Sequence, residues 1–134
     1  MRKNPFEKYL SKEDLLQRKV VTYVKLQYGV TCIPLNTESK KSRFEQYKFK
    51  EMGGIKGQPD LFIPVPNSQY SGMFIELKAD GVTVFKKDGS LRAGEHLQNQ
   101  NNYHEMLKKQ GYWAGFCIGI DQTLEEIDKY FQKK

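Results

Sequence analysis

Gly57-Gln58-Pro59-Asp60-Leu61-Phe62-Ile63, followed by Met73-Phe74-Ile75-Glu76-Leu77-Lys78, is the part of the sequence that decides the fold. Both stretches are apolar and bounded by turn residues, which predicts a strand over 60–65 and a second over 73–79. The polar segment 67–72 between them is typical of a turn. Pairing the two strands as a hairpin brings Asp60 roughly opposite Glu76.

A long helix is expected before the hairpin. Ser11 opens it, with Asp14 three residues later in the pattern of a capping box, and Gly29 ends it after about Tyr28. Its inner side is predicted to carry apolar or long side chains, namely Leu16, Val20, Tyr23, Val24 and Gln27.

The remaining elements alternate between strands and helices. We expect a short strand over 31–35, a short helix over 44–52, an extended piece over 82–85, a helix over 95–110 ended by Gly111, and a strand over 112–120. Asp121 or Thr123 is expected to cap a last helix. This order predicts one α/β domain over 1–134, a small mixed β-sheet flanked by helices on both faces.

The basic residues are concentrated in the first part of the chain. The net charge is +6, and residues 1–57 carry 13 Lys and Arg against 6 Asp and Glu, whereas 58–134 carry 9 against 10. A basic surface with interleaved aromatic side chains attracts a phosphate backbone. The residues predicted to contact DNA are Lys40, Lys41, Arg43, Lys48, Lys50 and Lys56, with Phe44, Tyr47 and Phe49 between them.

Cysteine usage and hydropathy indicate the expected compartment. Cys32 and Cys117 lie in apolar surroundings and are predicted to be buried reduced thiols rather than a disulfide. The N-terminus lacks the apolar core of a secretory signal, and no apolar run approaches the length of a membrane span. We expect a cytoplasmic protein with no membrane partner, in a bacterial or phage-infected host cell.

The hairpin carries the chemistry. Side chains alternate faces along a strand, so Glu76 and Lys78 share one face, and Asp60 joins them from the paired strand. A surface ion pair would explain Glu76 with Lys78 alone, but two acids held together repel unless a cation or a proton intervenes. Carboxylate oxygens suit Mg²⁺ or Mn²⁺, so the hairpin predicts a metal site beside a lysine.

Two residues on the helices are further candidates. Glu13 lies in the first turn of the first helix, where an acid is favourable at a helix N-terminus, yet its spacing from Leu16 points it along the inner side. Gln100 lies on the inner side of the helix over 95–110, where its amide must find a partner. His96 and His104 have no acid or nucleophile at a fixed offset, so neither is predicted to be catalytic.

Pro59-Asp60 with Glu76-Leu77-Lys78 resembles the PD-(D/E)XK nuclease motif, and the wider pattern resembles its VRR-NUC branch. That pattern consists of Met52-Gly53, Gly57-Gln58-Pro59-Asp60-Leu61, Ile75-Glu76-Leu77-Lys78, and Gln100 followed by Tyr103, Leu107 and Gly111-Tyr112. Glu13, Leu16 and Gln17 fit the opening of the branch. The similarity covers a core over about residues 11–131 and is typical of a stand-alone member from phages or bacteria.

The resemblance implies a restriction-endonuclease-like αβββαβ core. It implies a divalent metal bound by Asp60, Glu76 and the main-chain carbonyl of Leu77, with Glu13 near a second ion. Lys78 would position or activate the attacking water, and Gln100 would orient Lys78 or touch the substrate. The basic segment from Glu38 to Lys56 does not follow the family pattern closely, so no DNA contact is transferred there.

The expected activity is metal-dependent hydrolysis of DNA phosphodiester bonds. Stand-alone members are similar to Holliday-junction resolvases, which implies a homodimer that cuts four-way junctions or flaps in DNA recombination or repair. Exposed aromatic residues such as Tyr9, Phe44 or Phe85 could line its interface. Two alternatives stay open, a non-catalytic DNA-binding or assembly module on a nuclease-like scaffold and a sequence-specific restriction-type endonuclease.

Overall fold

A four-stranded mixed sheet forms the centre of the protein in a computed structural model that describes residues 4–35 and 42–133. The strands follow the order β1-β2-β3-β4, and β3 pairs antiparallel with β2 and parallel with β4, as the predicted mixed sheet requires. Their bounds are β1 Ile33–Pro34, β2 Leu61–Ile63, β3 Met73–Lys78 and β4 Trp113–Ile118.

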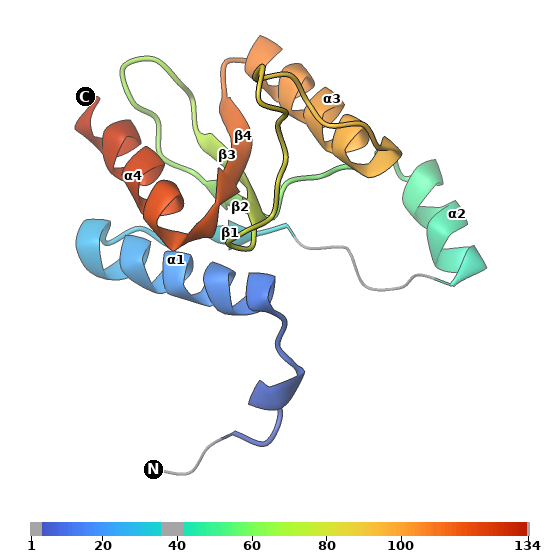
Figure 1. Cartoon of the computed structure of the whole chain (residues 1–134), viewed down its shortest axis with the longest axis horizontal. Coiled ribbons are helices and arrows are strands. Elements are labelled where there is room, and N and C mark those ends of the chain that lie inside the picture. Colours follow the sequence, from blue (N-terminus) through green and yellow to red (C-terminus); the bar gives the residue numbers. More distant parts are fainter. Residues whose placement is uncertain (1–3, 36–41, 134) are drawn as a thin grey trace.

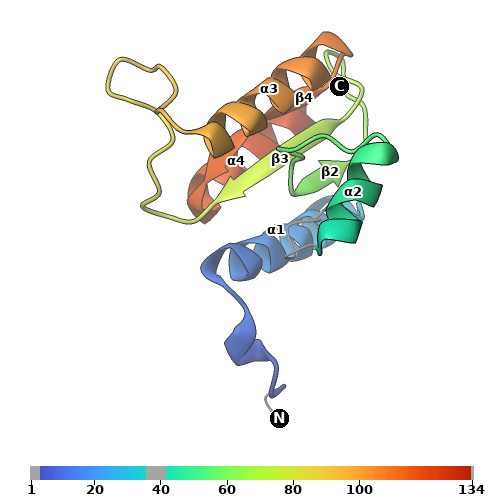
Figure 2. The same cartoon turned by 90° about the vertical axis from the view of Figure 1, so that its right-hand side faces the viewer.

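Helices cover both faces of this sheet, as expected (Figures 1 and 2). Helices α1 and α4 pack on one face and α3 lies on the other. Their bounds are α1 Lys12–Tyr28, α2 Arg43–Glu51, α3 Glu95–Lys109 and α4 Gly119–Gln132, and a 3-10 turn, η1 Glu7–Tyr9, precedes them. The order α1-β1-β2-β3-α3-β4 is the expected αβββαβ core, with α2 inserted between β1 and β2 and α4 added after β4.

The ends of α1 are set by local sequence, as predicted. Ser11 Oγ accepts a hydrogen bond from the Asp14 N–H at 3.0 Å, and the Ser11 N–H donates to Asp14 Oδ2 at 2.9 Å. Gly29 ends the helix with a φ of 68°, a left-handed conformation that costs glycine little. The expectation for Gln27 was wrong, because the buried stripe continues at Tyr28, which stacks on Phe131 at 3.9 Å between ring centroids.

The β2–β3 hairpin has the predicted pairing. Leu61 lies opposite Ile75 and Ile63 lies opposite Met73, and all four side chains are buried in the core against α1 and α4. Because side chains alternate faces along a strand, Glu76 and Lys78 lie on the opposite face of β3, toward α3. One face of the hairpin therefore packs in the apolar core, and the other carries charged residues.

The start of α4 differs from the sequence-based prediction. The helix begins at Gly119, so Asp121 and Thr123 lie inside it and neither is its cap. Gly119 has a φ of 76°, which turns the chain directly from β4 into the helix. The side chain that binds the exposed N–H of Ile118 is that of Gln122, at 2.6 Å.

The expected extended piece over 82–85 forms no strand. Residues 79–94 are a loop that folds back on itself through a single bridge between Phe85 and Leu91, and Val84 is fully buried beneath it. The segment pairs with the second half of the same loop and not with the sheet, so it adds no strand to the sheet.

Two further expectations concern the thiols and membrane association. Cys32 and Cys117 are buried and not disulfide-bonded, and burial raises their pKa values to about 11 and about 12. Both thiols therefore stay protonated at neutral pH. Within the described part of the chain, no helix has the length and apolar character needed to cross a bilayer.

Helices α1 and α4 are joined by one shared carboxylate. Asp128 Oδ1 on α4 accepts hydrogen bonds from the hydroxyls of Tyr23 at 2.7 Å and Tyr28 at 2.5 Å, both on α1. Burial, together with Asp128, raises the pKa of Tyr28 above its ordinary value. A charged acceptor makes such hydrogen bonds stronger than neutral ones.

Replacing Asp128 with alanine should therefore lower the free energy of unfolding by about 1.5–3 kcal/mol, because two half-buried hydroxyls lose a charged acceptor. Urea titration followed by circular dichroism measures this change. Glu125→Ala is the matched control on the same helix, since its ion pair with Lys129 is exposed and should contribute less than about 1 kcal/mol. Equal losses in the two variants would contradict this role for Asp128.

Candidate active site

Three charged side chains are buried, although burying an ionised group costs free energy. Among residues 4–35 and 42–133, the Asp, Glu, Lys and Arg side chains in the interior are Glu76, Lys78 and Asp60, with exposed fractions of 1%, 7% and 8%. They are the three residues that the hairpin motif singles out. Concentrating charge where it is least favourable is typical of a functional site rather than of a stabilising core.

Asp60 is attached to β3 by its backbone and its side chain. The Asp60 N–H donates to the Ile75 carbonyl at 3.0 Å, and Asp60 Oδ2 accepts a hydrogen bond from the Leu77 N–H at 2.7 Å. Asp60 directly precedes the first residue of β2, and its carboxylate takes the place of a backbone acceptor there. Leu61 pairs with Ile75 in the antiparallel register. The next position along the two chains sets Asp60 across from Glu76, as the predicted hairpin requires.

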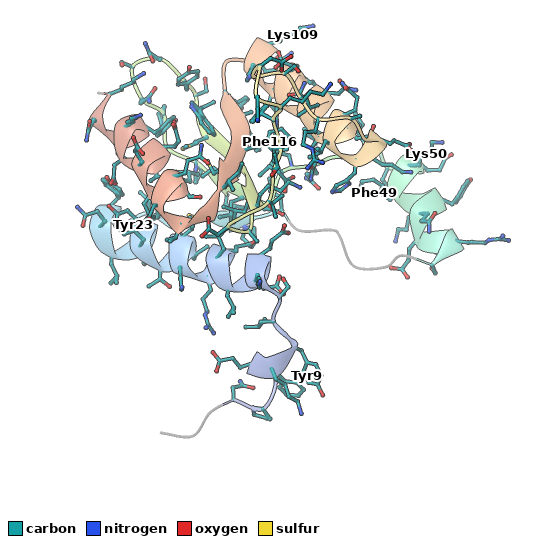
Figure 3. The ribbon with its side chains drawn as sticks, viewed as in Figure 1. Tyr9, Tyr23, Phe49, Lys50, Lys109 and Phe116 are labelled. Carbon is teal, nitrogen blue, oxygen red and sulfur yellow. The ribbon has the colours of Figure 1, made fainter. Side chains whose placement is uncertain are left out.

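Lys78 and Glu76 project from the face of β3 that is turned toward α3. On the neighbouring strand Phe116 pairs with Glu76, and the Lys78 Nζ lies 5.9 Å from the centroid of the Phe116 ring. An ammonium over an aromatic face is stabilised by the ring quadrupole. Phe116 (Figure 3) therefore supports the lysine from the side of β4.

Phe116 is a residue whose place in the site the sequence analysis missed. Its ring also contacts His104 on α3, at 4.6 Å between ring centroids, and Phe85 of the 79–94 loop, at 5.9 Å. It thus joins the strand, the helix and the loop around Lys78. The only sign of this in the sequence is the alternation along β4, which puts Phe116 and Ala114 on one face of the strand and Cys117 on the other.

Helix α3 contributes two buried polar side chains one turn apart. Gln100 and His104 are each 1% exposed. Neither polar atom of the Gln100 amide, nor the Nε2 of His104, has a hydrogen-bond partner in the described part of the chain. Buried polar groups are normally paired, so this helix face is suited to receive a polar group from outside the protein.

His104 is held neutral. Its pKa is lowered to about 4, mainly by burial and also by the Lys108 and Lys78 cations, whereas Glu105 opposes the shift. A neutral imidazole beside Lys78 adds no like charge to the ammonium. The i, i+4 spacing from Gln100 was the available sign that both side chains share a face.

The loop before Asp60 lies directly on the backbone of α3. Gly57 has a φ of 96°, and a Cβ added there would come within 2.4 Å of the Asn99 carbonyl oxygen and 2.8 Å of the Gln100 nitrogen. Only glycine allows this approach. Gly57 therefore sets how closely Asp60 on the hairpin and Gln100 on α3 come together.

The predicted metal ligands are oxygen donors of a kind that hard cations prefer. Asp60 and Glu76 come from neighbouring positions of the β2–β3 hairpin, and the Asp60 carboxylate accepts a hydrogen bond from the backbone of Leu77, the residue whose carbonyl is the third predicted ligand. This donor set fits Mg²⁺ or Mn²⁺ and includes no thiolate, because Cys32 and Cys117 belong to the apolar core.

Glu13 lies half-buried in the first turn of α1, beside the buried stripe that begins at Leu16. Across the described residues no group of three His, Cys, Asp or Glu side chains is placed to hold a metal ion. The structure therefore does not gather Glu13 into one cluster with Asp60 and Glu76. Its role near a second ion stays a prediction.

The predicted DNA-contacting residues fall in one region of the chain. Arg43, Lys48 and Lys50 lie on α2 and Lys56 on the segment after it, and all four are exposed. Lys40 and Lys41 lie outside the described residues. Exposure keeps the four cations available to a polyanion, and their contacts with DNA stay a prediction.

Comparison with known proteins supports the fold. A solved structure described as a VRR_NUC domain protein superposes with a TM-score of 0.65 at 29% sequence identity, over 90% of this chain and 88% of that chain. No protein-family model matches the sequence, and a search of curated proteins gives no match. The small mixed sheet with flanking helices is thus shared with a VRR_NUC domain protein, in agreement with the resemblance in the sequence.

Replacing Gly57 with alanine tests the close approach to α3. Gly89→Ala is a matched control, because Gly89 has a φ of 87° but nothing within 4 Å of an added Cβ. Backbone strain should lower the free energy of unfolding by about 1 kcal/mol in both variants. Overpacking against α3 should add roughly 1–3 kcal/mol in Gly57→Ala alone, measured by urea titration. Equal stability of the two variants would refute the contact.

Proposed function

We propose that this protein is a metal-dependent DNA endonuclease that hydrolyses phosphodiester bonds. The observation that carries the proposal is the burial of Asp60, Glu76 and Lys78 together at the end of the β2–β3 hairpin. Burying an ammonium and two carboxylates stabilises a fold no better than an apolar cluster of similar volume would. The likeness to a solved VRR_NUC domain protein supports the same activity class.

The ion would be held by Asp60, Glu76 and the Leu77 carbonyl, with Glu13 proposed near a second ion. When bound, Mg²⁺ or Mn²⁺ would lower the pKa of a water molecule and neutralise charge on the phosphate. The hydrogen bond from the Leu77 N–H fixes one oxygen of the Asp60 carboxylate. A carboxylate oriented in this way needs little rearrangement to accept a cation.

Lys78 would position the attacking water and stabilise the negative charge that develops on the phosphate. Preorganised cations act most strongly where water is excluded, and Lys78 is only 7% exposed. Phe116 holds its ammonium from one side. Gln100, whose amide atoms have no partner among the described residues, would orient Lys78 or bind a phosphate oxygen.

The proposed substrate is branched DNA, a four-way junction or a flap, cut by a homodimer. Two symmetric nicks require two sites related by a two-fold axis. Tyr9 and Phe85 are exposed, at 72% and 44%, and are available to an interface.

Cleavage assays on four-way, flap and linear DNA, each with Mg²⁺, Mn²⁺ or EDTA, test the activity. Asp60→Asn keeps an acceptor for the Leu77 N–H but removes the charge, and Lys78→Ala removes the ammonium. Each should reduce the cleavage rate by about 100-fold or more while DNA binding persists. Lys86→Ala, an exposed lysine of the 79–94 loop, is the control and should cut at the wild-type rate.

Metal-dependent cleavage at the wild-type rate by Asp60→Asn or Lys78→Ala would refute the assigned roles. Binding without cleavage by the wild-type protein in every metal would favour the non-catalytic module. A fixed cut sequence in linear duplex would favour a restriction-type enzyme over a branch-selective one.

Light scattering tests the proposed dimer. We expect a mass near twice 15.7 kDa at assay concentration, because each protomer supplies one site. A strict monomer that still makes paired nicks would contradict the two-fold arrangement.

A further inference from the structure

Helix α2 stands apart from the sheet (Figure 1) and contributes nothing to the core. No residue of α2 is buried. Its N-terminus is held locally, because Ser42 Oγ accepts from the Glu45 N–H at 3.2 Å and the Ser42 N–H donates to Glu45 Oε1 at 3.4 Å. A helix with its own cap and no fully buried residue is available for contact with a partner.

The inner side of α2 is marked by Phe49. Its ring lies against the turn that follows the helix, since a Cβ added to Gly54 would come within 2.5 Å of it. Figure 3 labels Phe49 beside Lys50 at this end of the helix. With 100° between successive residues, the opposite side of α2 carries Phe44 and Tyr47, which are 68% and 64% exposed.

We call Phe44 and Tyr47, with the cations beside them, the outer face of α2. The two rings are three residues apart and so neighbour each other along one face. Arg43 and Lys50 flank them on one side and Lys48 on the other, all exposed. The outer face therefore alternates flat apolar surfaces with positive charge.

We propose that the outer face of α2 binds unpaired nucleotides, with Phe44 and Tyr47 stacked on bases and Arg43, Lys48 and Lys50 on the phosphates. This inference rests on the proposed function and assigns its substrate a single-stranded segment. Aromatic side chains within a basic groove stack on bases of any sequence. A continuous duplex hides the faces of its bases, so exposed rings gain contacts only where bases are unstacked.

The segment that connects α2 to the buried acids is held against α3 at one point. The segment 52–59 joins the helix to Asp60, and within it Gly57 lies against the backbone of Asn99 and Gln100. Nucleotides held on α2 are thereby tied to the strand end where hydrolysis is proposed. The proposed single-stranded contact therefore lies on the segment that leads directly into the candidate site.

Charge favours a nucleic acid over a second copy of this chain. Residues 42–57 carry four Lys and Arg against two Glu, and all six are exposed. An excess of cations attracts a phosphate backbone, whereas a two-fold contact would bring the same excess against itself. The second copy is the rival that the experiment must separate.

The test uses two DNA probes in EDTA, so that no cleavage occurs. One carries 2-aminopurine within a single-stranded gap, and the other carries it in a fully paired duplex of the same sequence. Stacking on a protein ring quenches the fluorescence of 2-aminopurine. The wild-type protein should bind the gapped probe more tightly and quench it.

The double variant Phe44→Ala, Tyr47→Ala should bind the gapped probe roughly tenfold or more weakly and lose the quenching, with duplex affinity unchanged. Alanine is a better helix former than either aromatic residue, so α2 should persist. Lys48→Ala should weaken both probes alike and reduce the salt dependence of binding. Phe6→Ala, at another exposed aromatic residue, is the control and should change neither probe.

If the aromatic double variant loses affinity equally for both probes, or for neither, the inference is overturned. Cleavage by the wild-type protein would still support the proposed nuclease activity. Conversion of a dimer to a monomer by the same variant, measured by light scattering, would assign the face to a second copy and overturn it as well. Wild-type protein that neither binds nor cuts any probe would overturn both proposals.

Discussion

The hydrogen bond from the Leu77 N–H to the Asp60 carboxylate, 2.7 Å long, ties the candidate site to the sheet. Asp60 lies just before the first residue of β2, where β3 extends past its partner strand. A side chain therefore replaces the missing backbone acceptor. The carboxylate is thereby fixed beside Glu76 rather than left to rotate in solvent. Because β3 is buried on both faces here and paired with β4 along its other edge, small displacements of Asp60 are resisted by the packing of the sheet.

The two faces of the sheet have different tasks for a physical reason. Against α1 and α4 lie apolar side chains such as Ile75 and Leu77, which remove surface from water and stabilise the fold. Against α3 lie Glu76 and Lys78, whose burial opposes folding. The first face holds the backbone of β3 in place, and so allows the second to present charges in a fixed geometry, as proposed for phosphate hydrolysis.

Sequence patterns predicted the elements that depend on neighbouring residues. The capping box at Ser11, the glycine stop at Gly29 and the alternation along 73–78 act within a few residues, and each is confirmed. The error in α1 arose from a contact with a distant residue, and the error at α4 arose from the conformation of one glycine. The stripe of α1 continues at Tyr28 because Phe131 on α4 stacks there, and α4 starts at Gly119 because its φ of 76° turns the chain out of β4.

By itself the sequence determined that Asp60, Glu76 and Lys78 share one hairpin, because period-two alternation and a turn fix both the face and the register. Only the tertiary structure decided that these charges are buried and that α3 faces them with Gln100 and His104. It also decided that Phe116 supports Lys78 and that Gly57 lies against α3. Such contacts join residues far apart in the chain. The helical period shows which side of α3 faces inward, but not which residues of the sheet it meets.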